Sequence, residues 1–501
     1  MGIIVRQSLK AGFGFYLGAL IGIINQMFVS THFLSVEQLA VSRLLIENAL
    51  LFATFSHIGA PLIADKFFGH FRNDEQQHQG LFLFLLSLPL LGGTVFTILY
   101  FVFTPEIESY FVRRSPLLVD YHKLVVPFTF LWVYLMVLES YCRNHARIAI
   151  PSFIREVYLR SMNVLLILMF GMGWYSFDTL LYLTLAAYGL AVAFLLYYVA
   201  HLGKLYLRWP SRGYFTKAQV RKMLGYGSFS LLSGLGVSLL LTIDRSMLAG
   251  EKGLISTGIF IIAAYIAGII EIPKKAISQI SIPYISDALR LGKIEEVRTL
   301  TQKSALHQLL VGGIFFLILW VNIDDLFRFL PKGEIYMEGK FVVLLIGLIK
   351  VFDIGTGLNT EIILYSKYYR WATIMIVAAA FISFVLNLWL IPIYGFNGAA
   401  AATVLTTLGL SIAKLLFVQR KFKIHPFTLN TLKLLLMFSG LFILISFYPS
   451  RPHTLWQSFF TMAIKSGILL LGFGFMVYKF QISPEVNKVM DTVLNRLRKQ
   501  G

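Results

Sequence analysis

Three charged residues and a serine recur at helical spacing inside a long apolar stretch, residues 254–290. Glu271, Lys274, Lys275 and Ser278 stand at i, i+3, i+4 and i+7, so they share one face of a helix. An ionisable group at the centre of a bilayer costs about 2.5–3.5 kcal/mol on insertion scales. Three such groups on one face are expected to look into a protein-lined or watery cavity. We therefore interpret this helix as one wall of a transport site.

Other apolar stretches repeat this pattern of embedded charge. In the second apolar run, Arg43, Glu47, Thr54 and His57 also share one helical face. Two more such faces are formed by Glu156, Arg160 and Asn163, and by Lys350, Asp353, Gly357 and Glu361. Several polar faces within one bundle predict a central cationic cavity, which suits an anionic substrate.

A simpler interpretation is that the charges neutralise one another and lock helices together, because a buried ion pair needs no ligand. The adjacent lysines Lys274 and Lys275 argue against it, since Glu271 cannot neutralise both. Pro273 has no backbone N–H to donate, so it predicts either a hinge or a static kink beside these charges. The pairs expected under this interpretation are Arg43 with Glu47, Glu156 with Arg160, Glu271 with Lys275, and Lys350 with Asp353.

The composition indicates a polytopic membrane protein. Of its 501 residues, 57% are hydrophobic and only 14% are charged, whereas a soluble protein carries about 25% charged residues. Apolar runs of about 20 residues, long enough to cross a bilayer as helices, recur from end to end. The net charge of +19 is explained by basic cytoplasmic loops and anionic lipid rather than by nucleic acid. Cys142 is the only cysteine, which excludes an intrachain disulfide.

We predict an all-α fold with about fourteen spans and with both termini in the cytoplasm. In this orientation the inner segments, counted with the span ends, hold 28 Lys and Arg and the outer ones hold 8, as the positive-inside rule requires. The predicted spans are 9–33, 39–63, 80–103, 122–142, 150–174, 177–202, 224–249, 254–282, 303–322, 339–364, 371–392, 396–418, 430–448 and 456–479.

The longest inner connection, residues 203–223, carries six basic residues and is interpreted as a hinge between two lobes. Weak internal similarity, such as Pro61–Asp65 against Pro283–Asp287, supports two pseudo-symmetric repeats of six spans. Ser483 is expected to cap a short interfacial helix in the C-terminal tail. The predicted parts are an N-terminal lobe 1–202, a basic linker 203–223, a C-terminal lobe 224–418, appended spans within 419–479 and an amphipathic tail 480–501.

The sequence carries no enzyme signature. It has no phosphate-cradling Gly-rich loop, no paired-histidine metal motif and no nucleophile elbow. Its ten histidines are scattered, mostly in loops or near the ends of spans. We therefore expect no enzyme activity, no catalytic residue, no metal site and no cofactor.

Two stretches resemble bacterial polysaccharide exporters. Residues 387–403, NLWLIPIYGFNGAAAAT, resemble the NLxLIPxxGxxGAAxAT turn of those proteins. Asp244-Arg245 followed by Gly258-Ile259-Phe260 resembles their entry into the eighth span, with Phe260 in place of the usual Tyr. By these motifs the chain is similar to the Wzx-like flippases of the multidrug/oligosaccharidyl-lipid/polysaccharide (MOP) exporter superfamily. Two six-span lobes with an appended pair also fit that family.

The resemblance implies movement of polyprenyl-pyrophosphate-linked oligosaccharides from the cytoplasmic to the outer leaflet of the bacterial plasma (inner) membrane, by alternating access between lobes. The glycans would serve surface polysaccharides such as O-antigen or lipopolysaccharide. The implied partners are the lipid-linked glycan, membrane lipid, and the glycan polymerase and glycosyltransferases of the same pathway. The protein itself is expected to be a monomer. The implied diphosphate-binding residues are Arg43, Lys274, Lys275 and, less directly, Lys350, and the candidate carboxylates for pairing or for a coupling H⁺ or Na⁺ are Glu47, Glu271, Asp353 and Glu361.

Three other functions remain open. A cation-coupled drug or metabolite antiporter of the same superfamily would be expected to rely on carboxylates, whereas the embedded residues here favour Lys and Arg. A peptidoglycan-precursor flippase of the same fold would need nearly identical chemistry. A non-transporting scaffold would have no reason to retain several charged faces.

Overall fold

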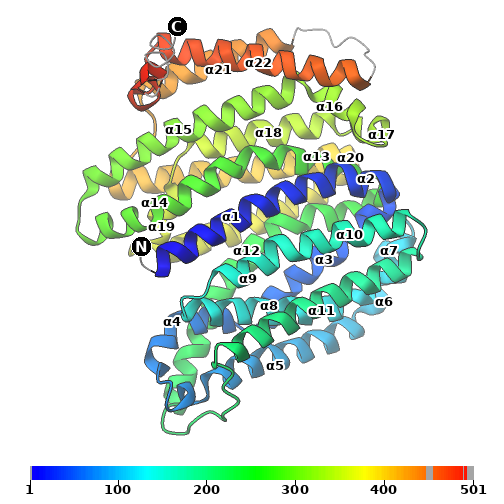
Figure 1. Ribbon diagram of the computed structural model, residues 1–501, viewed down its shortest axis with the longest axis vertical. Coiled ribbons are helices and arrows are strands. Elements are labelled where there is room, and N and C mark those ends of the chain that lie inside the picture. The colour runs from blue at the N-terminus through cyan, green and yellow to red at the C-terminus, as the bar shows by residue number, and fades with distance from the viewer. Residues whose placement is uncertain (1–2, 447–454, 489, 493–501) are drawn as a thin grey trace. The chain divides into compact units, whose positions relative to one another are not determined.

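The computed structural model describes residues 3–446, 455–488 and 490–492. Within these ranges, the side chains of residues 3–11, 230, 273, 275, 276, 279, 445, 446, 455 and 456 lie outside the description. The described residues form helices joined by short loops, and they contain no strand (Figure 1). Ten of these helices are long and apolar enough to cross a membrane. The predicted fold class, an all-α polytopic membrane protein, is confirmed.

Each predicted span coincides with helical structure, although ten helices rather than fourteen qualify as unbroken spans. The difference arises where helices are broken or joined. The span at 150–174 is interrupted by a π-helical turn, Ile154–Tyr158, and the span at 339–364 is divided into two helices. The spans at 371–392 and 396–418 form one long helix with a sharp kink at Gly395, where φ is 58° and ψ is −133°. The helix in the span at 430–448 is apolar but short.

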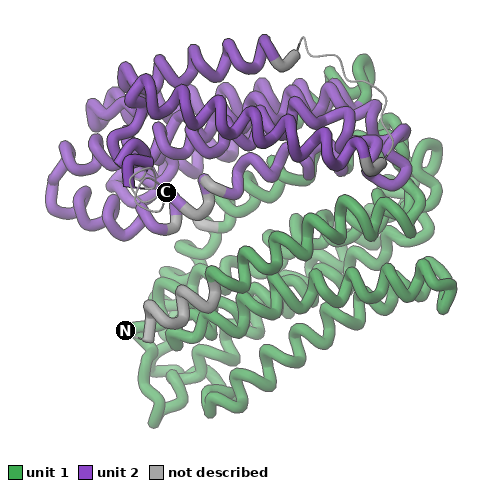
Figure 2. Tube along the Cα trace, turned by 45° about the horizontal axis from the view of Figure 1, so that its top comes forward, with its two compact units in different colours: residues 1–258, 383–395 green, residues 259–382, 396–501 purple. Residues whose placement is uncertain are grey.

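The chain forms two compact units, which Figure 2 colours separately. Unit 1 comprises residues 1–258 and 383–395. Its helices are α1 (Ile3–Ile24), α2 (Ser30–Phe33), α3 (Val36–Ser56), α4 (Ala60–Phe71), α5 (Leu81–Val102), α6 (Thr104–Phe111), α7 (Pro116–Tyr121), α8 (Val125–Asn144), α9 (Ala149–Phe153), α10 (Leu159–Gly171), α11 (Phe177–His201) and α12 (Lys217–Lys252), with π-helical turns at Asn25–Val29 and Ile154–Tyr158 and 3₁₀ turns at Gln77–Gly80 and His122–Leu124.

The core of unit 1 is built around α3, which packs against α5, α8 and α12. Leu44 and Leu45 on α3 are fully buried, as apolar side chains at the centre of a helix bundle are expected to be. Between α3 and α4 the chain turns at Gly59, where φ is 75° and an added Cβ would lie 2.5 Å from the Cα of Gly227. At the end of α12, the Lys252 ammonium donates to the Pro392 carbonyl at 2.8 Å, which ties the segment 383–395 to this unit.

Unit 2 comprises residues 259–382 and 396–501. The helices α13 (Leu254–Gly268) and α20 (Tyr369–Phe422) each have residues in both units. The helices wholly in unit 2 are α14 (Ile272–Arg290), α15 (Ile294–Val321), α16 (Ile323–Phe329), α17 (Gly333–Met337), α18 (Lys340–Gly355), α19 (Asn359–Leu364), α21 (Leu429–Ser446) and α22 (Leu455–Lys479), and a 3₁₀ turn covers Ile269–Glu271.

The core of unit 2 is built around α15, which packs against α14, α18, α21 and α22. Phe316 and Leu317 on α15 are fully buried beside Phe438 of α21 and Phe473 of α22. After α22 the chain packs back on this core through the buried Ile482. The Ser483 hydroxyl then accepts a hydrogen bond from the Val486 backbone N–H at 3.3 Å, which is the predicted N-cap.

The predicted division into lobes stays a prediction. The grouping by packing divides the chain at residue 258 rather than within 203–223, because α12 packs against α3 and α4 in unit 1. Packing in a single state does not report which parts move together. Residues 447–454 and 493–501, within the predicted appended spans and tail, lie outside the described residues.

Candidate functional site

The predicted helix that carries Glu271 and Lys274 is interrupted immediately beside these two residues. α13 ends at Gly268, a 3₁₀ turn covers Ile269–Glu271, and α14 begins at Ile272 with Pro273 in its first turn. Proline suits this position because the first turn of a helix has no intrahelical acceptor for its N–H. The irregularity predicted from Pro273 is therefore present, one turn earlier than the proline. Whether it moves as a hinge stays a prediction.

Charges of this helix pair with charges on α18 within unit 2. The Lys350 ammonium contacts the Glu271 carboxylate at 2.6 Å, and the Lys274 ammonium contacts that of Asp353. The second oxygen of Asp353 accepts a hydrogen bond of 2.6 Å from the Ser411 hydroxyl on α20. The four charged side chains are 19–24% exposed. Ion pairs this far from solvent are screened less than surface pairs and hold the two helices in register.

This pairing differs from the pairs expected by sequence spacing. Lys350 and Asp353 lie on one helix but bind partners on another, because the oppositely charged faces of packed helices meet. Spacing identifies which residues share a face but not what that face packs against. The expected pair of Glu271 with Lys275 falls on a side chain outside the described part of the structure.

Two further charged side chains extend this cluster. The Lys414 ammonium on α20 donates to the Thr360 hydroxyl on α19 at 3.1 Å, so it turns toward the cluster rather than toward the bilayer surface. The Glu361 carboxylate oxygen Oε2 and the Ser278 hydroxyl are both buried, and neither has a hydrogen-bond partner among the described residues. The electrostatic influence of Glu361 reaches both Lys274 and Lys414.

We call this group the unit 2 cluster; its members are Glu271, Lys274, Lys350, Asp353, Glu361 and Lys414. With three lysines and three carboxylates, its described side chains are balanced in charge. The predicted positive surplus in this region therefore depends on Lys275, whose side chain is not described.

In unit 1, two arginines converge on one carboxylate. The Arg245 guanidinium on α12 pairs with Glu47 on α3, and Arg43 Nε lies 3.8 Å from the same Glu47 oxygen. Arg43 Nε is buried and makes no hydrogen bond to any described residue. Beside them the Ser246 hydroxyl donates to Asn48 at 2.7 Å. Glu47 therefore has two cationic neighbours, of which Arg43 is the more weakly held.

Sequence reasoning missed the role of Arg245. The spacing within span 2 identifies Arg43 and Glu47, but Arg245 lies near the end of a different span, where the sequence alone favours an interfacial position. The sequence did offer one sign that Arg245 matters: Asp244 and Arg245 begin one of the two motifs that resemble polysaccharide exporters. In the structure, Arg245 of α12 instead contacts Glu47 on the charged face of α3.

The face formed by Glu156 and Arg160 is internally satisfied. Glu156 contacts Arg160 at 2.8 Å and Arg155 at 3.1 Å, and the Arg160 guanidinium also donates to the Gly18 carbonyl at 2.6 Å. α1 approaches so closely that an added Cβ on Gly18 would lie 2.3 Å from the Glu156 carbonyl oxygen. These charges lock α1 to the α9–α10 segment, as the simpler interpretation predicted.

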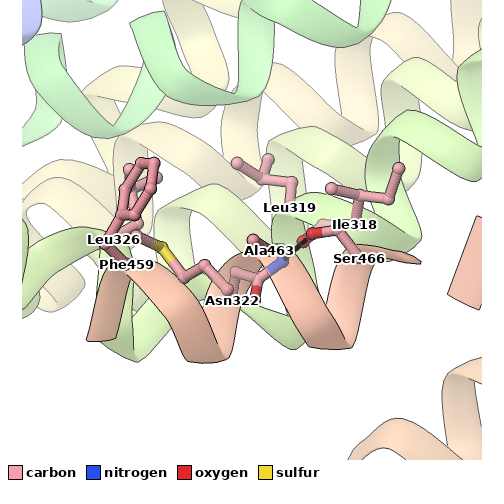
Figure 3. A pocket seen from close by; sticks show the side chains of 8 residues that line it. Ile318, Leu319, Asn322, Leu326, Phe459, Ala463 and Ser466 are labelled. Atoms are coloured by element: carbon pink, nitrogen blue, oxygen red, sulfur yellow. Dashed lines mark hydrogen bonds between the residues drawn. The ribbon is translucent and has the colours of Figure 1, made fainter. Parts of the chain in front are cut away.

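A separate cavity of about 300 Å³ lies in unit 2 between α15, α16 and α22 (Figure 3). Its walls are apolar apart from Asn322 and Ser466, which are joined by a hydrogen bond of 2.9 Å. None of the predicted site residues lines it. Among the described residues, no three His, Cys, Asp or Glu side chains gather as a metal site would require.

Comparison with solved structures identifies the fold. The inward-facing structure of a multidrug resistance MATE family transporter of the MOP superfamily aligns with a TM-score of 0.64 and 16% identity, covering 84% of this chain and 98% of that one. The lipid II flippase MurJ, in an inward closed conformation, aligns with a TM-score of 0.66 and 13% identity, covering 96% of this chain and 100% of that one. The chain has the fold of the MOP superfamily transporters. A MOP superfamily transporter from Pyrococcus furiosus aligns similarly, with a TM-score of 0.58, 17% identity, and coverage of 84% and 95%.

The MurJ alignment reaches further along this chain than the other two. The 16% left uncovered by the MATE structure corresponds to about 80 of the 501 residues. No protein-family model matches the sequence, and no curated protein matches it either.

Proposed function

We propose that this protein is a flippase that moves polyprenyl-pyrophosphate-linked oligosaccharides across the bacterial plasma membrane by alternating access, for surface polysaccharide synthesis. The observation that carries the proposal is the alignment with a lipid II flippase over 96% of this chain and all of that one. The embedded arginines and lysines add to this support, because a diphosphate is the anionic part of such a substrate.

Each unit by itself offers cationic donors to which a diphosphate would bind by exchanging with carboxylates. In unit 1, a phosphate oxygen would take a donor from Arg43, whose Nε is not hydrogen-bonded, while Arg245 stays on Glu47. In unit 2, Lys350 and Lys274 would release Glu271 and Asp353 in favour of phosphate oxygens. Charge-assisted hydrogen bonds to phosphate are strong enough to replace those to carboxylate. Lys275 is proposed as a further donor on the same helix.

Coupling to a proton is best assigned to Glu361. Of the four candidate carboxylates, Glu47, Glu271 and Asp353 each form an ion pair, whereas Glu361 forms none with the described residues. Oε2 of Glu361 and Oε2 of Glu47 both lack a hydrogen-bond partner among the described residues. Na⁺ fits this place less well, because the ammonium groups of Lys274 and Lys414 act on the same carboxylate.

The competing proposal is a cation-coupled drug or metabolite antiporter, which the alignment with the MATE transporter favours. The two proposals differ in substrate and can be separated in proteoliposomes. The purified protein should move a polyprenyl-pyrophosphate-linked oligosaccharide between leaflets, scored by its accessibility to an added glycosidase. Export of a cationic drug without movement of the lipid-linked glycan would overturn the flippase proposal.

Variants test the assigned residues. Arg43→Gln should reduce glycan movement by about tenfold or more, since a hydrogen-bonded charge contributes about 1.5–3 kcal/mol. Glu361→Gln should abolish stimulation by a pH gradient while leaving movement down a substrate gradient. Arg290→Gln, at a 71% exposed side chain, is the matched control and should have no effect. Normal movement by Arg43→Gln at normal protein level would remove Arg43 from the site.

A further inference from the structure

Two histidines of unit 1, one buried and one half-buried, meet at their ring nitrogens. His78, in the 3₁₀ turn before α5, and His145, just after α8, approach with Nε2 to Nε2 at 3.1 Å. The His78 side chain is 1% exposed. Neither residue belongs to the charged faces described above, and the transport proposal does not use them.

The backbone fixes which nitrogen of each ring carries the proton. The Asn73 backbone N–H donates to His78 Nδ1 at 3.1 Å, so that nitrogen is unprotonated and His78 Nε2 carries the hydrogen. His145 Nδ1 lies 2.9 Å from the Tyr141 carbonyl, which only accepts, so His145 Nδ1 is protonated and its Nε2 holds a lone pair. His78 Nε2–H therefore donates to His145 Nε2, and both rings are neutral.

The same assignment argues against a metal ion between the rings. A metal ligand would need the lone pair of His78 Nε2, and its Nδ1 would then carry a hydrogen facing the Asn73 N–H. Asp74, the nearest carboxylate, is held instead by Lys204 at 2.7 Å. The arrangement is complete as a hydrogen-bonded pair.

The pair lies where the linker following α11 is fastened to unit 1. The Tyr206 ring meets the His78 ring edge to face at 5.0 Å, and the Tyr141 hydroxyl donates to the Lys204 carbonyl at 3.0 Å. The Ser211 backbone N–H donates to the Gln79 carbonyl, one residue beyond His78, at 3.0 Å. Residues 204–211 are thus bound to the turn and the helix end that the two histidines join.

Close backbone packing adds to this attachment. An added Cβ on Gly80, where φ is 85°, would lie 2.5 Å from the Trp209 carbonyl oxygen, and the Arg208 guanidinium donates to the Gln76 carbonyl at 3.1 Å. The linker therefore cannot keep this position if the turn at 77–80 shifts. A change at the histidine pair would be transmitted to the linker directly.

We propose that the His78–His145 pair is an acid-sensitive clip that holds the linker 204–211 on unit 1 and releases it when a proton is added. A second proton on the facing nitrogens would set two N–H groups against each other at 3.1 Å. A proton on His78 Nδ1 would instead oppose the Asn73 N–H. Either addition breaks a partly buried hydrogen bond and adds a charge beside the buried His78 ring, so it disfavours the fastened state.

The charged groups around the pair have opposing effects on protonation of its rings. Lys204 and Arg72 disfavour a proton on His145, whereas Asp74, 3.5 Å from His78 Nε2, favours one. Burial is the largest influence and lowers the pKa of His145 below its ordinary value of 6.5. Because the folded pKa lies below the unfolded one, the clip is at full strength above about pH 6.5 and weakens as the pH falls. On the predicted topology the clip senses the cytoplasm.

The clip can be tested with a spin label on the linker of the full-length protein in nanodiscs. Arg212→Cys places the label at an exposed position just after the fastened segment, and Cys142, the native cysteine, is buried. Electron paramagnetic resonance should show an immobilised label at pH 7.5. We expect the immobilised component to be lost on acidification, with a midpoint below pH 6.5.

Glutamine variants separate the clip from general acid effects. In His78→Gln/His145→Gln the amides can still hydrogen-bond but cannot titrate, so the pH response should disappear. His145→Gln alone gives the same test if the double variant does not fold. His70→Gln, whose exposed ring contacts Tyr214, is the matched control and should keep the response. A label equally immobile at both pH values in the parent protein, or a response that survives in the glutamine variants, would overturn the proposal.

Discussion

The ion pair between Glu271 and Lys350 offers a measurement that separates a structural role from a substrate-binding role. At 2.6 Å the gross attraction is about 6 kcal/mol for an effective dielectric constant of 20, and desolvation of both groups offsets much of it. Removing one partner of a buried pair costs about 3–5 kcal/mol, and an exposed pair contributes about 0–1. Since each side chain is 24% exposed, we expect Lys350→Met and Glu271→Gln each to destabilise unit 2 by about 2–3 kcal/mol.

The double variant Glu271→Gln/Lys350→Met carries no unpaired charge and should recover most of the lost stability. Thermal unfolding of the four proteins in one detergent measures this cycle, and glycan movement in proteoliposomes is measured in parallel. If Lys350 binds the diphosphate, movement stays reduced in the double variant although its stability returns. If movement returns together with stability, the pair is structural and Lys350 leaves the proposed site. Lys293→Met, in a surface pair with Glu296, controls for loss of a charge alone.

Three further outcomes are expected. In Arg245→Gln, Glu47 should pair with Arg43 instead, so Arg43 is no longer available to phosphate and glycan movement should fall by about tenfold. The loss of stability should be smaller than in the single variants of Glu271 and Lys350, and the same two assays measure both effects. Gly59→Ala should destabilise the protein by more than about 1 kcal/mol in thermal unfolding, because φ is 75° and the new Cβ would meet backbone, whereas Gly69→Ala, with no atom nearby, should be neutral or stabilising. Lys303 lowers the pKa of Glu485 from 4.5 to about 2. This pair should therefore hold the segment after α22 against α15 fully above about pH 4.5 and lose its effect as the pH falls toward 2. Chemical cross-linking between that segment and α15 measures this, and cross-linking that already weakens at pH 6 would contradict it.

Sequence periodicity predicted the helical spans and the short-range pairs of embedded charges, because both depend on local spacing. The predicted face of Lys350, Asp353, Gly357 and Glu361 was wrong, because α18 ends at Gly355 and Glu361 lies on α19. It did not predict the break between α3 and α4, although Gly59 is visible in the sequence, since a glycine alone does not show that a turn is needed. Nor did it predict that Lys350 and Asp353 bind charges on another helix. Such pairs depend on how packed helices are rotated about their axes, which spacing along one helix leaves undetermined.

The identification of Arg245 was limited in a different way. Its position near a span end favours an interfacial interpretation, and only the approach of α12 to α3 brings it to Glu47. Lys414 also lies near a span end, where a lysine is expected to extend to the bilayer surface, but it turns toward Thr360 on α19. In both cases a neighbouring helix supplies the partner, and that neighbour is distant in sequence.

The segment 383–395 affects how the gene can be divided. Because this segment belongs to unit 1 although unit 2 precedes and follows it in the chain, a fragment ending at residue 258 lacks a part of its own unit. The Lys252–Pro392 contact would be absent from such a fragment. Complementation by two separately translated halves therefore requires the second half to supply this segment in trans. A division after residue 395 instead keeps both parts of unit 1 in one fragment.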